Sequence, residues 1–461
     1  MSSLYGILNT GGTALLVQQN AIDVAGHNIA NVNTPGFSRQ KVDMETNTPL
    51  NTAPGQTGAG VNAAEILRIY DRFLGKQIYD ENQTLGNWEA QKGIYERVEM
   101  LFDESTGYGL NQAMSEFWNA WQDIANNPTD SASRTALLAK SETMATSFNN
   151  MDSNLKGIQK DIDSSIIGTL EEINSITGQI AGLNEKIVLI EVGGQNANDY
   201  RDSRDILLKD LSLMIDIEAF ENSEGKATVL TVGGRPLVEN FSSWDLSTRN
   251  GVSGLKDVLL TDSEGTSVDI TDDISGGKLK GWLEARDVTI ADHLSNLDDL
   301  AAEIIQEVNV LHSAGYGLDS TTGDDFFTGT SALDIAVHQD IVDDVNKIAV
   351  AGGEGGVGDN SNAIEIANLQ NALKMNSDTV SFDDYYNSLV SNVGNDMLTA
   401  TVNFDQESIM ITQLNNRRES VSGVSLDEEM VDLIKFQHAY NAAARLISIV
   451  DELLDRVTSM V

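Results

Sequence analysis

Residue types that could do chemistry occur in this chain, but they do not gather into a recognisable active site. The most suggestive is a glycine-rich stretch at 352–358, which contains one G-x-G-x-x-G match. Such a match can hold phosphate at the start of a helix when it lies in a βαβ unit. Glu354 and Asp359 would repel phosphate, and no βαβ repeat surrounds the match. We therefore interpret the stretch as a flexible loop that leads into a helix over 363–375.

Histidines and paired carboxylates are the second set of candidates. Acidic pairs at 272–273, 324–325, 343–344 and 383–384 could bind calcium or act as a carboxylate dyad. Calcium needs six to eight organised oxygens, so an acidic surface in water explains these pairs better. The histidines lie far apart in the sequence and fit solvated or core positions: His27, His293, His312, His338 and His438. The sequence thus predicts no catalytic residue, no metal site and no cofactor, and it favours a protein that is not an enzyme.

The composition narrows the class of protein further. The chain has 461 residues, no cysteine and a net charge of −41. Without cysteine it has no disulfide, thiol nucleophile or cysteine zinc site, and its charge opposes nucleic-acid binding, which usually needs a basic face. No apolar run approaches the ~18 residues of a membrane span. The N-terminus shows no basic segment before an apolar core, so we expect a cytoplasmic protein or one exported without a cleaved signal.

The elements that would position any site are mostly helices, and the two ends of the chain are the most regular. Both ends carry apolar residues spaced alternately three and four apart, which is the repeat of a coiled coil. The stripes are Leu4, Leu8, Gly11, Leu15, Gln18, Ile22, Ala25, Ile29 and Val32, and Met430, Leu433, Phe436, Tyr440, Ala444, Ile447, Val450, Leu454, Val457 and Val461. A lone helix cannot bury such a stripe, so we expect the ends to pair with each other and with other subunits. The first helix must end before Pro35, and Ser425 with Glu428 is a candidate capping box for the last.

Between its two ends, the chain is predicted to be helical with one β-rich insert. Helical spacing covers residues 64–103, 110–126, 130–192, 288–313 and 382–416. The segment at 130–192 alone predicts a rod about 90 Å long. Short β-branched runs with turn signals at 215–275 predict hairpins. We expect an elongated, mainly α subunit in three parts: paired terminal helices (1–50 with 420–461), a long helical bundle (51–205 with 285–419) and an inserted β-rich outer domain (206–284).

Several segments resemble a known family. Residues 30–37, Ala-Asn-Val-Asn-Thr-Pro-Gly-Phe, resemble the signature of the bacterial flagellar axial proteins, which comprise rod, hook and junction proteins. The continuation Ser38-Arg39-Gln40 and the segment 422–429 are most similar to the junction members. Segments 201–205 and 358–363 add interior matches, whereas Asn441 departs from the glutamine that is common there. The motif residues are Ala30, Asn31, Thr34, Pro35, Gly36, Phe37, Asp427, Glu428 and Gln437.

The resemblance implies a structural role. Flagellar axial proteins build tubes whose terminal helices line an export channel, so it implies a self-assembling extracellular protein that forms the junction ring between hook and filament. Export would use the flagellar type III apparatus without a cleaved signal. Implied partners are identical subunits, the hook protein, a second junction protein (hook-associated protein 3) and an export chaperone at the C-terminal region, with no nucleic acid and no membrane. The implied subunit interface comprises Leu4, Leu8, Leu15, Ile22, Ile29, Val32, Met430, Leu433, Tyr440, Ile447, Val450, Leu454 and Val457.

Other interpretations stay open at this point. A hook or distal rod protein would belong to the same structural class, although the Ser38-Arg39-Gln40 continuation and the helix at 130–192 speak against it. A wall hydrolase carried on the flagellar axis would need a carboxylate pair with one raised pKa, and an outward-facing binding module would use the β-rich insert. The turn at 34–36 has two possible roles: it only redirects the chain, or its side chains also contact neighbouring subunits. Proline and glycine favour turns in any case, so we favour the purely structural role.

Overall fold

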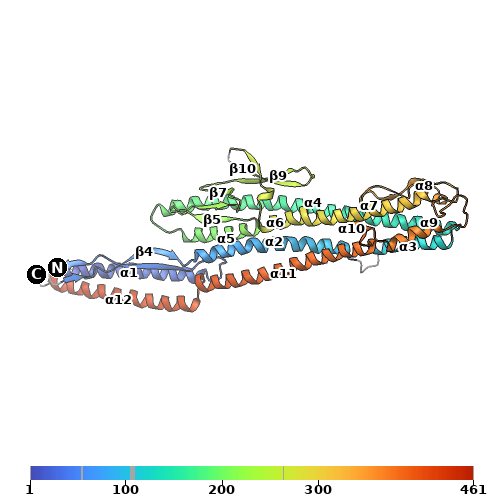
Figure 1. Cartoon of the computed structure of the whole chain (residues 1–461). Helices are drawn as coiled ribbons and strands as arrows, with labels where there is room; N and C mark the ends of the chain where they lie inside the picture. The colour runs from blue at the N-terminus through green and yellow to red at the C-terminus, as the bar shows by residue number, and fades with distance from the viewer. Residues whose placement is uncertain (1, 53–54, 104–108, 263, 460–461) are drawn as a thin grey trace.

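The protein is elongated, and both ends of its chain lie at the same end of the molecule (Figure 1). The computed structural model describes residues 2–52, 55–103, 109–262 and 264–459. At one end α1 (Ser2–Ala30) and α12 (Leu426–Ser459) run side by side. A helical bundle forms the rest of the length, with a β-rich domain on one side of it. The mainly α architecture with a β-rich insert is confirmed. Val461, the last residue of the stripe predicted for the C-terminal helix, lies outside the described residues.

The bundle is built from helices whose apolar faces meet in one continuous core. Its helices are α2 (Arg72–Phe102), α3 (Leu110–Asn126), α4 (Ser131–Glu191), α5 (Asn198–Met214), α6 (Gly277–Glu284), α7 (Ile290–Ala314) and α11 (Phe382–Ser422), with a π-helical turn at Ala285–Thr289 between α6 and α7. The 61-residue α4 matches the helix predicted over 130–192. Asp130 caps it by accepting a hydrogen bond from Ser133 N at 2.9 Å. Met144 and Phe148 of its stripe are fully buried, so the face that predicts the helix also holds the bundle together.

Aromatic side chains close the far end of the bundle, away from the termini. Trp118 stacks on Phe382 with ring centroids 5.9 Å apart, and Trp121 packs against Phe117 and Phe326. Short elements cover this end: α8 (Gln339–Asp343), α9 (Ser361–Asn368), α10 (Met375–Asp378), β12 (Phe327–Thr328) and β13 (Ala336–Val337). These buried rings are the aromatic end of the same continuous core.

The glycine-rich loop before α9 is shaped by its own aspartate. Asp359 accepts hydrogen bonds from Ser361 N at 3.0 Å and Gly352 N at 2.8 Å, and these bonds lower the pKa of its carboxyl group. The helix predicted over 363–375 is wrong in its second half, because α9 ends at Asn368. Farther on, Asn376 has a φ of 51°, which no right-handed helix accommodates.

The histidines and acidic pairs do not form a metal site. Across the described residues, no group of three or more His, Cys, Asp or Glu side chains is placed to hold a metal ion. His312 instead belongs to the core: its Nε2 accepts from Ala349 N at 3.0 Å, so its Nδ1 donates to Asp324 O at 2.7 Å. Burial lowers the pKa of His312 to about 4. Among the described helices, none is both long enough and apolar enough to cross a membrane.

The β-rich domain consists of antiparallel strands beside α4 and α5. One sheet contains β5 (Glu218–Glu221), β6 (Ala227–Leu230), β7 (Pro236–Glu239) and β8 (Ser242–Ser243), and another contains β9 (Asp245–Asn250), β10 (Lys256–Thr261) and β11 (Ser267–Asp269). Asn174 of α4 fastens β9 to the bundle: its Oδ1 accepts from Leu246 N at 2.7 Å and its Nδ2 donates to Leu246 O at 2.8 Å. The hairpins predicted over 215–275 are confirmed.

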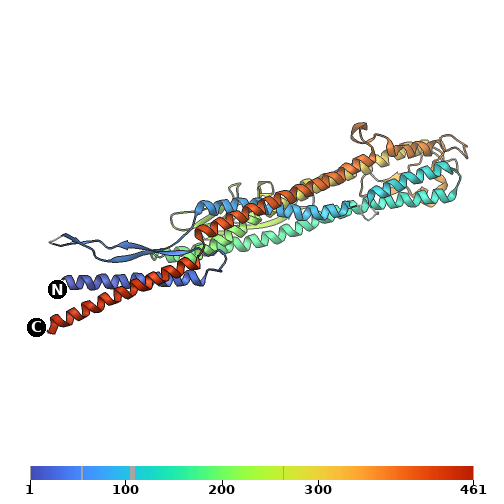
Figure 2. The ribbon, with the colours of Figure 1, turned by 90° about the horizontal axis from the view of Figure 1, so that it is seen from below.

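A β-ribbon lies along α1, where the sequence predicts no strand (Figure 2). In it β1 (Gln40–Thr46) pairs with β4 (Val61–Arg68), and β2 (Leu50–Thr52) pairs with β3 (Gly55–Thr57) toward the tip. The helix predicted over 64–103 is therefore wrong at its start. It begins only at Arg72, because Asp71 caps it by accepting from Phe73 N at 3.0 Å.

Candidate assembly interface at the paired terminal helices

Most predicted interface residues are at least half-buried where α1 and α12 run side by side. The half-buried ones are Leu4, Leu8, Leu15, Ile22, Ile29, Val32, Leu433, Tyr440, Ile447 and Leu454; Val450 is buried. Met430 and Val457 differ, because they are 50% and 43% exposed. Gly11 allows close approach of the two helices: a Cβ there would lie 2.9 Å from Ile447 Cγ1. Gly11, a glycine in an otherwise mainly apolar stripe, is therefore a packing site.

A second face of α1 packs on the ribbon and is better buried than the predicted stripe. Ala21 and Val24 form a small core with Val42 of β1. Ala63 of β4 and Phe436 of α12 pack against this core. The first helix is therefore held between α12 and the ribbon, so a single chain already gives α1 two partners.

α12 carries a second apolar face that is exposed in the single chain. We call it the outer face of α12; it comprises Met430, Ile434, Ile449, Leu453 and Val457, which are 43–59% exposed. A fully buried side chain of this size contributes roughly 1.5–3 kcal/mol relative to an exposed one. A helix with apolar residues on two faces is typical of one packed on both sides. The outer face is therefore a candidate surface for contact with other copies.

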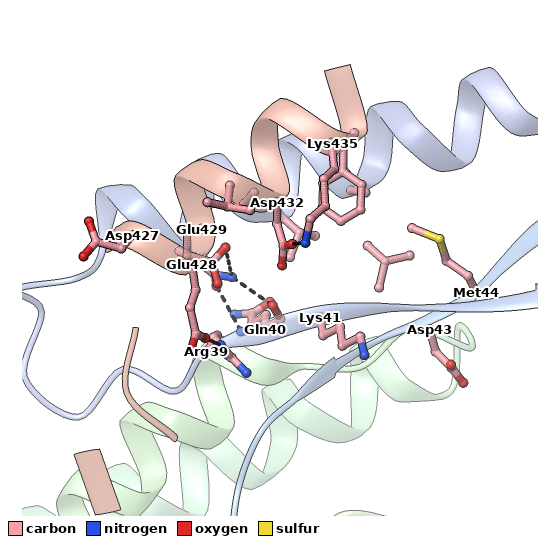
Figure 3. A pocket seen from close by; sticks show the side chains of 17 residues that line it. Arg39, Gln40, Lys41, Asp43, Met44, Asp427, Glu428, Glu429, Asp432 and Lys435 are labelled. Atoms are coloured by element: carbon pink, nitrogen blue, oxygen red, sulfur yellow. Dashed lines mark hydrogen bonds and ion pairs between the residues drawn. The ribbon is translucent and has the colours of Figure 1, made fainter. Parts of the chain in front are cut away.

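A buried amide at the end of α1 joins three elements. Asn28 donates from Nδ2 to Gln40 O at 2.9 Å and to Glu429 Oε2 at 3.1 Å, and its Oδ1 accepts from Gln40 N at 3.0 Å. Beside it, Arg39 Nη1 donates to Glu428 Oε2 at 2.6 Å (Figure 3). These contacts fix the start of α12 against α1 and β1.

The motif residues between α1 and the ribbon form a turn that rests on α5. Thr34 Oγ1 donates to Asn31 Oδ1 at 3.0 Å. Gly36 has a φ of +80°, and a Cβ there would lie 2.5 Å from Ile206 Cδ1, so glycine is needed both for the backbone and for the space. Of the other motif residues, Ala30, Pro35, Asp427 and Gln437 are exposed and Phe37 is half-buried. The turn redirects the chain and docks it on the bundle.

The aspartates of α5 hold the ribbon and the turn. Asp202 accepts from Ser38 N at 2.8 Å and from Arg68 Nη1 at 2.9 Å, and Asp205 accepts from the same Arg68 nitrogen at 2.6 Å. Burial raises the pKa of Asp205, although the positive charge of Arg68 opposes the shift. Two carboxylates thus share one guanidinium at the base of the terminal helices.

The arginines of the same helix face the β-rich domain. Arg201 forms paired hydrogen bonds with Glu191 at 2.7 and 2.9 Å and with Glu221 at 2.7 and 2.8 Å. Arg204, only 2% exposed, donates to Glu221 and to Asn184 Oδ1 at 2.9 Å. Residues three apart share a helix face, so the segment 201–205 presents its arginines to one domain and its aspartates to another.

A groove of about 810 Å³ lies between β1 and α12, with α1 as its floor (Figure 3). We call it the terminal groove. Val42 from β1 and Phe436 from α12 face it, and charged side chains stand along both walls. Sequence reasoning missed this groove because one of its walls is the ribbon that the sequence does not predict.

Glu429 offers a test of the contact between Asn28 and α12. Burial raises the pKa of Glu429 above its usual 4.5, so its contribution to stability is lost as pH rises through the raised value. Glu429→Gln keeps an acceptor for Asn28 and removes the charge. We therefore expect limited proteolysis at pH 7.5 to release the terminal helices more slowly from this variant than from the native chain, with a smaller difference at pH 5.

The neighbouring Glu428→Gln variant is the matched control. Glu428 is exposed and pairs with Arg39, and exposed pairs contribute about 0–1 kcal/mol. This variant should show no slower release at either pH. Faster release from Glu429→Gln than from the native chain at pH 7.5 would contradict the assigned role of burial.

Comparison with known protein families assigns the chain to one of them. The profile of the flagellar hook-associated protein FlgK helical domain matches residues 95–327, which is half of the chain. The flagellar basal body rod FlgEFG protein C-terminal profile matches residues 416–460, and the flagella basal body rod protein profile matches residues 8–37. The chain therefore belongs to the FlgK family of flagellar hook-associated junction proteins, and it is a structural component of the bacterial flagellum.

Similar proteins align with nearly the whole chain. Flagellar hook-associated protein 1 of Bacillus subtilis (strain 168) is 29% identical over 501 residues, covering 99% of this chain and 98% of that protein. Flagellar hook-associated protein 1 of Escherichia coli (strain K12) is 26% identical over 550 residues, covering all of both. The solved flagellar hook junction protein FlgK from Burkholderia pseudomallei superposes with a TM-score of 0.67 at 14% identity, covering 75% of this chain and 100% of that one. The last likeness shows the shared fold.

Proposed function

We propose that this chain forms the ring that joins the hook to the filament and that α1 and α12 are its assembly surfaces. The observation that carries the proposal is the outer face of α12, which stays exposed in a single copy although α12 is paired with α1. Copies packed around a common axis would cover that face. Assembly then belongs to the proposed terminal part (1–50 with 420–461) and to the ribbon that lies along α1. The rest of the proposed bundle (51–205 with 285–419) and the proposed β-rich domain (206–284) extend away from it.

The proposed place in the flagellum sets the partners. One side of the ring would contact the hook protein, and the other a second junction protein, hook-associated protein 3. Before assembly, an export chaperone would cover the C-terminal region, because exposed apolar faces promote aggregation. Subunits would travel through the flagellar type III apparatus and lie outside the cell. Residues 1–22 carry no charged side chain, so the net charge of −41 is carried by the rest of the chain and favours an outer surface in water.

Deleting the gene tests the proposal directly. Cells without this chain should keep their hooks, lose their filaments and release flagellin into the medium, and a plasmid copy should restore filaments. If the chain were instead a hook or distal rod protein, deletion would remove the hooks as well. Normal filaments after deletion would overturn the proposal.

We also propose that the chain works without catalysing a reaction, because its relatives are structural flagellar proteins. The alternative is a wall hydrolase carried on the flagellum. Incubating the purified full chain with peptidoglycan separates the two, with lysozyme as the positive control. Release of soluble wall fragments above the buffer background would contradict the non-catalytic role.

In the isolated subunit, the terminal helices should exchange amide hydrogens faster than the bundle does. α1 and α12 leave one apolar face uncovered, whereas α4 buries an apolar face along nearly its whole length. Helices with little packed area open at low free energy. Hydrogen exchange followed by mass spectrometry should therefore show early labelling of residues 2–30 and 426–459, with α4 as the internal control. Equal protection of α1, α12 and α4 in a verified monomer would contradict this prediction.

A further inference from the structure

The terminal helices and the helical bundle are packed as two separate units. We call α1, the ribbon and α12 the terminal unit; Ala21, Val24 and Val42 form its small core, and the bundle has its own continuous core. Among the described helices and strands, those of the terminal unit pack on one another rather than on the bundle. The chain passes between the two units only at 69–71, before α2, and at 423–425, before α12. We call the region where the units meet the joint (Figure 2).

Several hydrogen bonds cross the joint, and nearly all of their donors are amide groups. They join Gln40 to Asp199 and Asn198, Asn196 to Glu65 and Ile66 O, Asn198 to Ile66 O, His27 to Asp199, and Arg39 N to Ser422 O. A bond of this kind adds little to stability, because water offers the same groups equivalent partners when they separate. Units without a large apolar interface can change their relative orientation unless stronger contacts hold them.

One contact across the joint is of another kind, because it is both charged and buried. Arg68, the last residue of β4, donates from Nη1 to Asp202 Oδ1 at 2.9 Å and to Asp205 Oδ2 at 2.6 Å. The three side chains are 11%, 6% and 20% exposed. Asp202 also accepts from Ser38 N at 2.8 Å, so the aspartates of α5 hold both the ribbon and the turn. Hydrogen bonds between charged groups are roughly twice as strong as neutral ones.

Removing Arg68 would leave two buried carboxylates next to each other without a cation between them. Burial already raises the pKa of Asp205, and the positive charge of Arg68 opposes that shift. Arg204 also acts on Asp205, but its hydrogen bonds go to Glu221 and Asn184, toward the β-rich domain. Buried charges without a partner have to be hydrated. Water would therefore enter the joint between α5 and the ribbon and separate the two units.

A pocket of about 240 Å³ at the joint leaves space for such a movement. Pro35 and Gly36 of the turn form part of its wall. Well-packed contacts leave few voids larger than a water molecule, so the turn is not tightly packed on this side. Apart from the aspartate that Arg68 binds, the charged side chains of the pocket all belong to α5 and α11; they are Lys209, Asp210 and Arg418. They lie within the bundle and do not tie the terminal unit to it.

We infer that Arg68, through its bonds to Asp202 and Asp205, sets the angle between the terminal unit and the bundle. Without it, the two units swing as separate bodies about 69–71 and 423–425. Arg68 is thus a positioning residue within one copy, and its role does not depend on the proposed place of the chain in the flagellum. In the proposed ring, this angle would fix how each bundle stands relative to the common axis.

Spin labels test the orientation directly, because the native chain has no cysteine of its own. Ala439→Cys on α12 and Ser175→Cys on α4 place labels at exposed positions of the two units. Double electron–electron resonance on the purified full chain then gives the distribution of distances between them. We expect a narrow distribution with the native arginine and a several-fold wider one with Arg68→Met. Arg68→Lys should restore the narrow distribution, because a single nitrogen of Arg68 contacts both aspartates.

Two controls separate orientation from folding. Arg39→Met is the matched variant, because Arg39 pairs with Glu428 inside the terminal unit, and it should leave the distribution narrow. A second label pair, Thr46→Cys with Ser448→Cys, lies entirely in the terminal unit at exposed positions. Its distribution reports whether that unit stays folded, and it should not respond to Arg68→Met.

Three results would overturn the role of Arg68. The first is a distribution between the units that is equally narrow with and without the arginine, and the second is a native distribution that is already wide. The third is broadening of the second label pair in Arg68→Met, because Arg68 would then hold the terminal unit together rather than orient it. All three are read from the purified chain, whereas filaments kept or lost after gene deletion bear on the proposed function alone.

Discussion

Replacing both Ile434 and Ile449 by glutamate is expected to abolish filament attachment and to leave the free subunit folded. Both side chains lie on the outer face of α12 and are more than half exposed. Surface substitutions of this kind usually change stability by less than about 0.5 kcal/mol. In the assembled ring the same positions would be covered, and burying an unpaired carboxylate costs several kcal/mol. Assembly should therefore fail where folding does not.

Two measurements decide the result. The melting temperature of the purified variant should stay close to that of the native chain, and electron microscopy of cells should show hooks without filaments. The variant must also be detected in the medium, so that loss of export is not mistaken for loss of assembly. Val252→Glu, a fully exposed apolar position on the β-rich domain, is the matched control and should keep its filaments. Attached filaments in the double variant would contradict the role of the outer face.

Replacing Arg204 by methionine is expected to cost about 3 kcal/mol of unfolding free energy, at the lower end of the range for breaking a buried ion pair. Arg204 donates to Glu221, to Asn184 and to Gly225 O at 2.7 Å, and all three acceptors would lose a donor. The loss stays at the lower end because Arg201 still pairs with Glu221. Urea unfolding followed by circular dichroism measures it.

Arg72→Met is a matched control, because Arg72 faces the same glutamate from the outside. Its side chain is 80% exposed, and its Nη2 lies 3.7 Å from Glu221 Oε1. An exposed pair of this kind contributes about 0–1 kcal/mol. If Arg204→Met cost no more than Arg72→Met, the assignment of α5 as the buried link to the β-rich domain would be wrong.

The long elements could be predicted because their signals are local and repeated. α4 carries a stripe of apolar residues along most of its length, and most of that stripe lies on the buried face of the helix. The paired ends were recognised in the same way. Of the outer face of α12, however, the stripe includes only Met430 and Val457. A sequence with apolar residues on two helix faces does not show which face is covered within the chain.

The ribbon and the contacts of α5 could not be predicted, for two different reasons. β4 is exposed at most of its residues, so it lacks the alternation of buried and exposed positions that marks a strand. Ile66 and Ile69 then fit a helical spacing by chance. The segment 201–205 was noticed, but Ser38 and Arg68 lie more than 130 residues away from Asp202 in sequence. No local pattern names partners that only the folded chain brings together.

The shared position of the two chain ends decides where this protein can carry a label. A fluorescent tag fused to either terminus would stand beside α1 and α12, in the part proposed to be packed tightly among copies (Figure 1). The turn between β9 and β10 holds the fully exposed Val252 and lies at the side of the molecule, on the β-rich domain. A small tag inserted after Val252 should therefore report the number and turnover of subunits in living cells, whereas terminal fusions should not enter the flagellum.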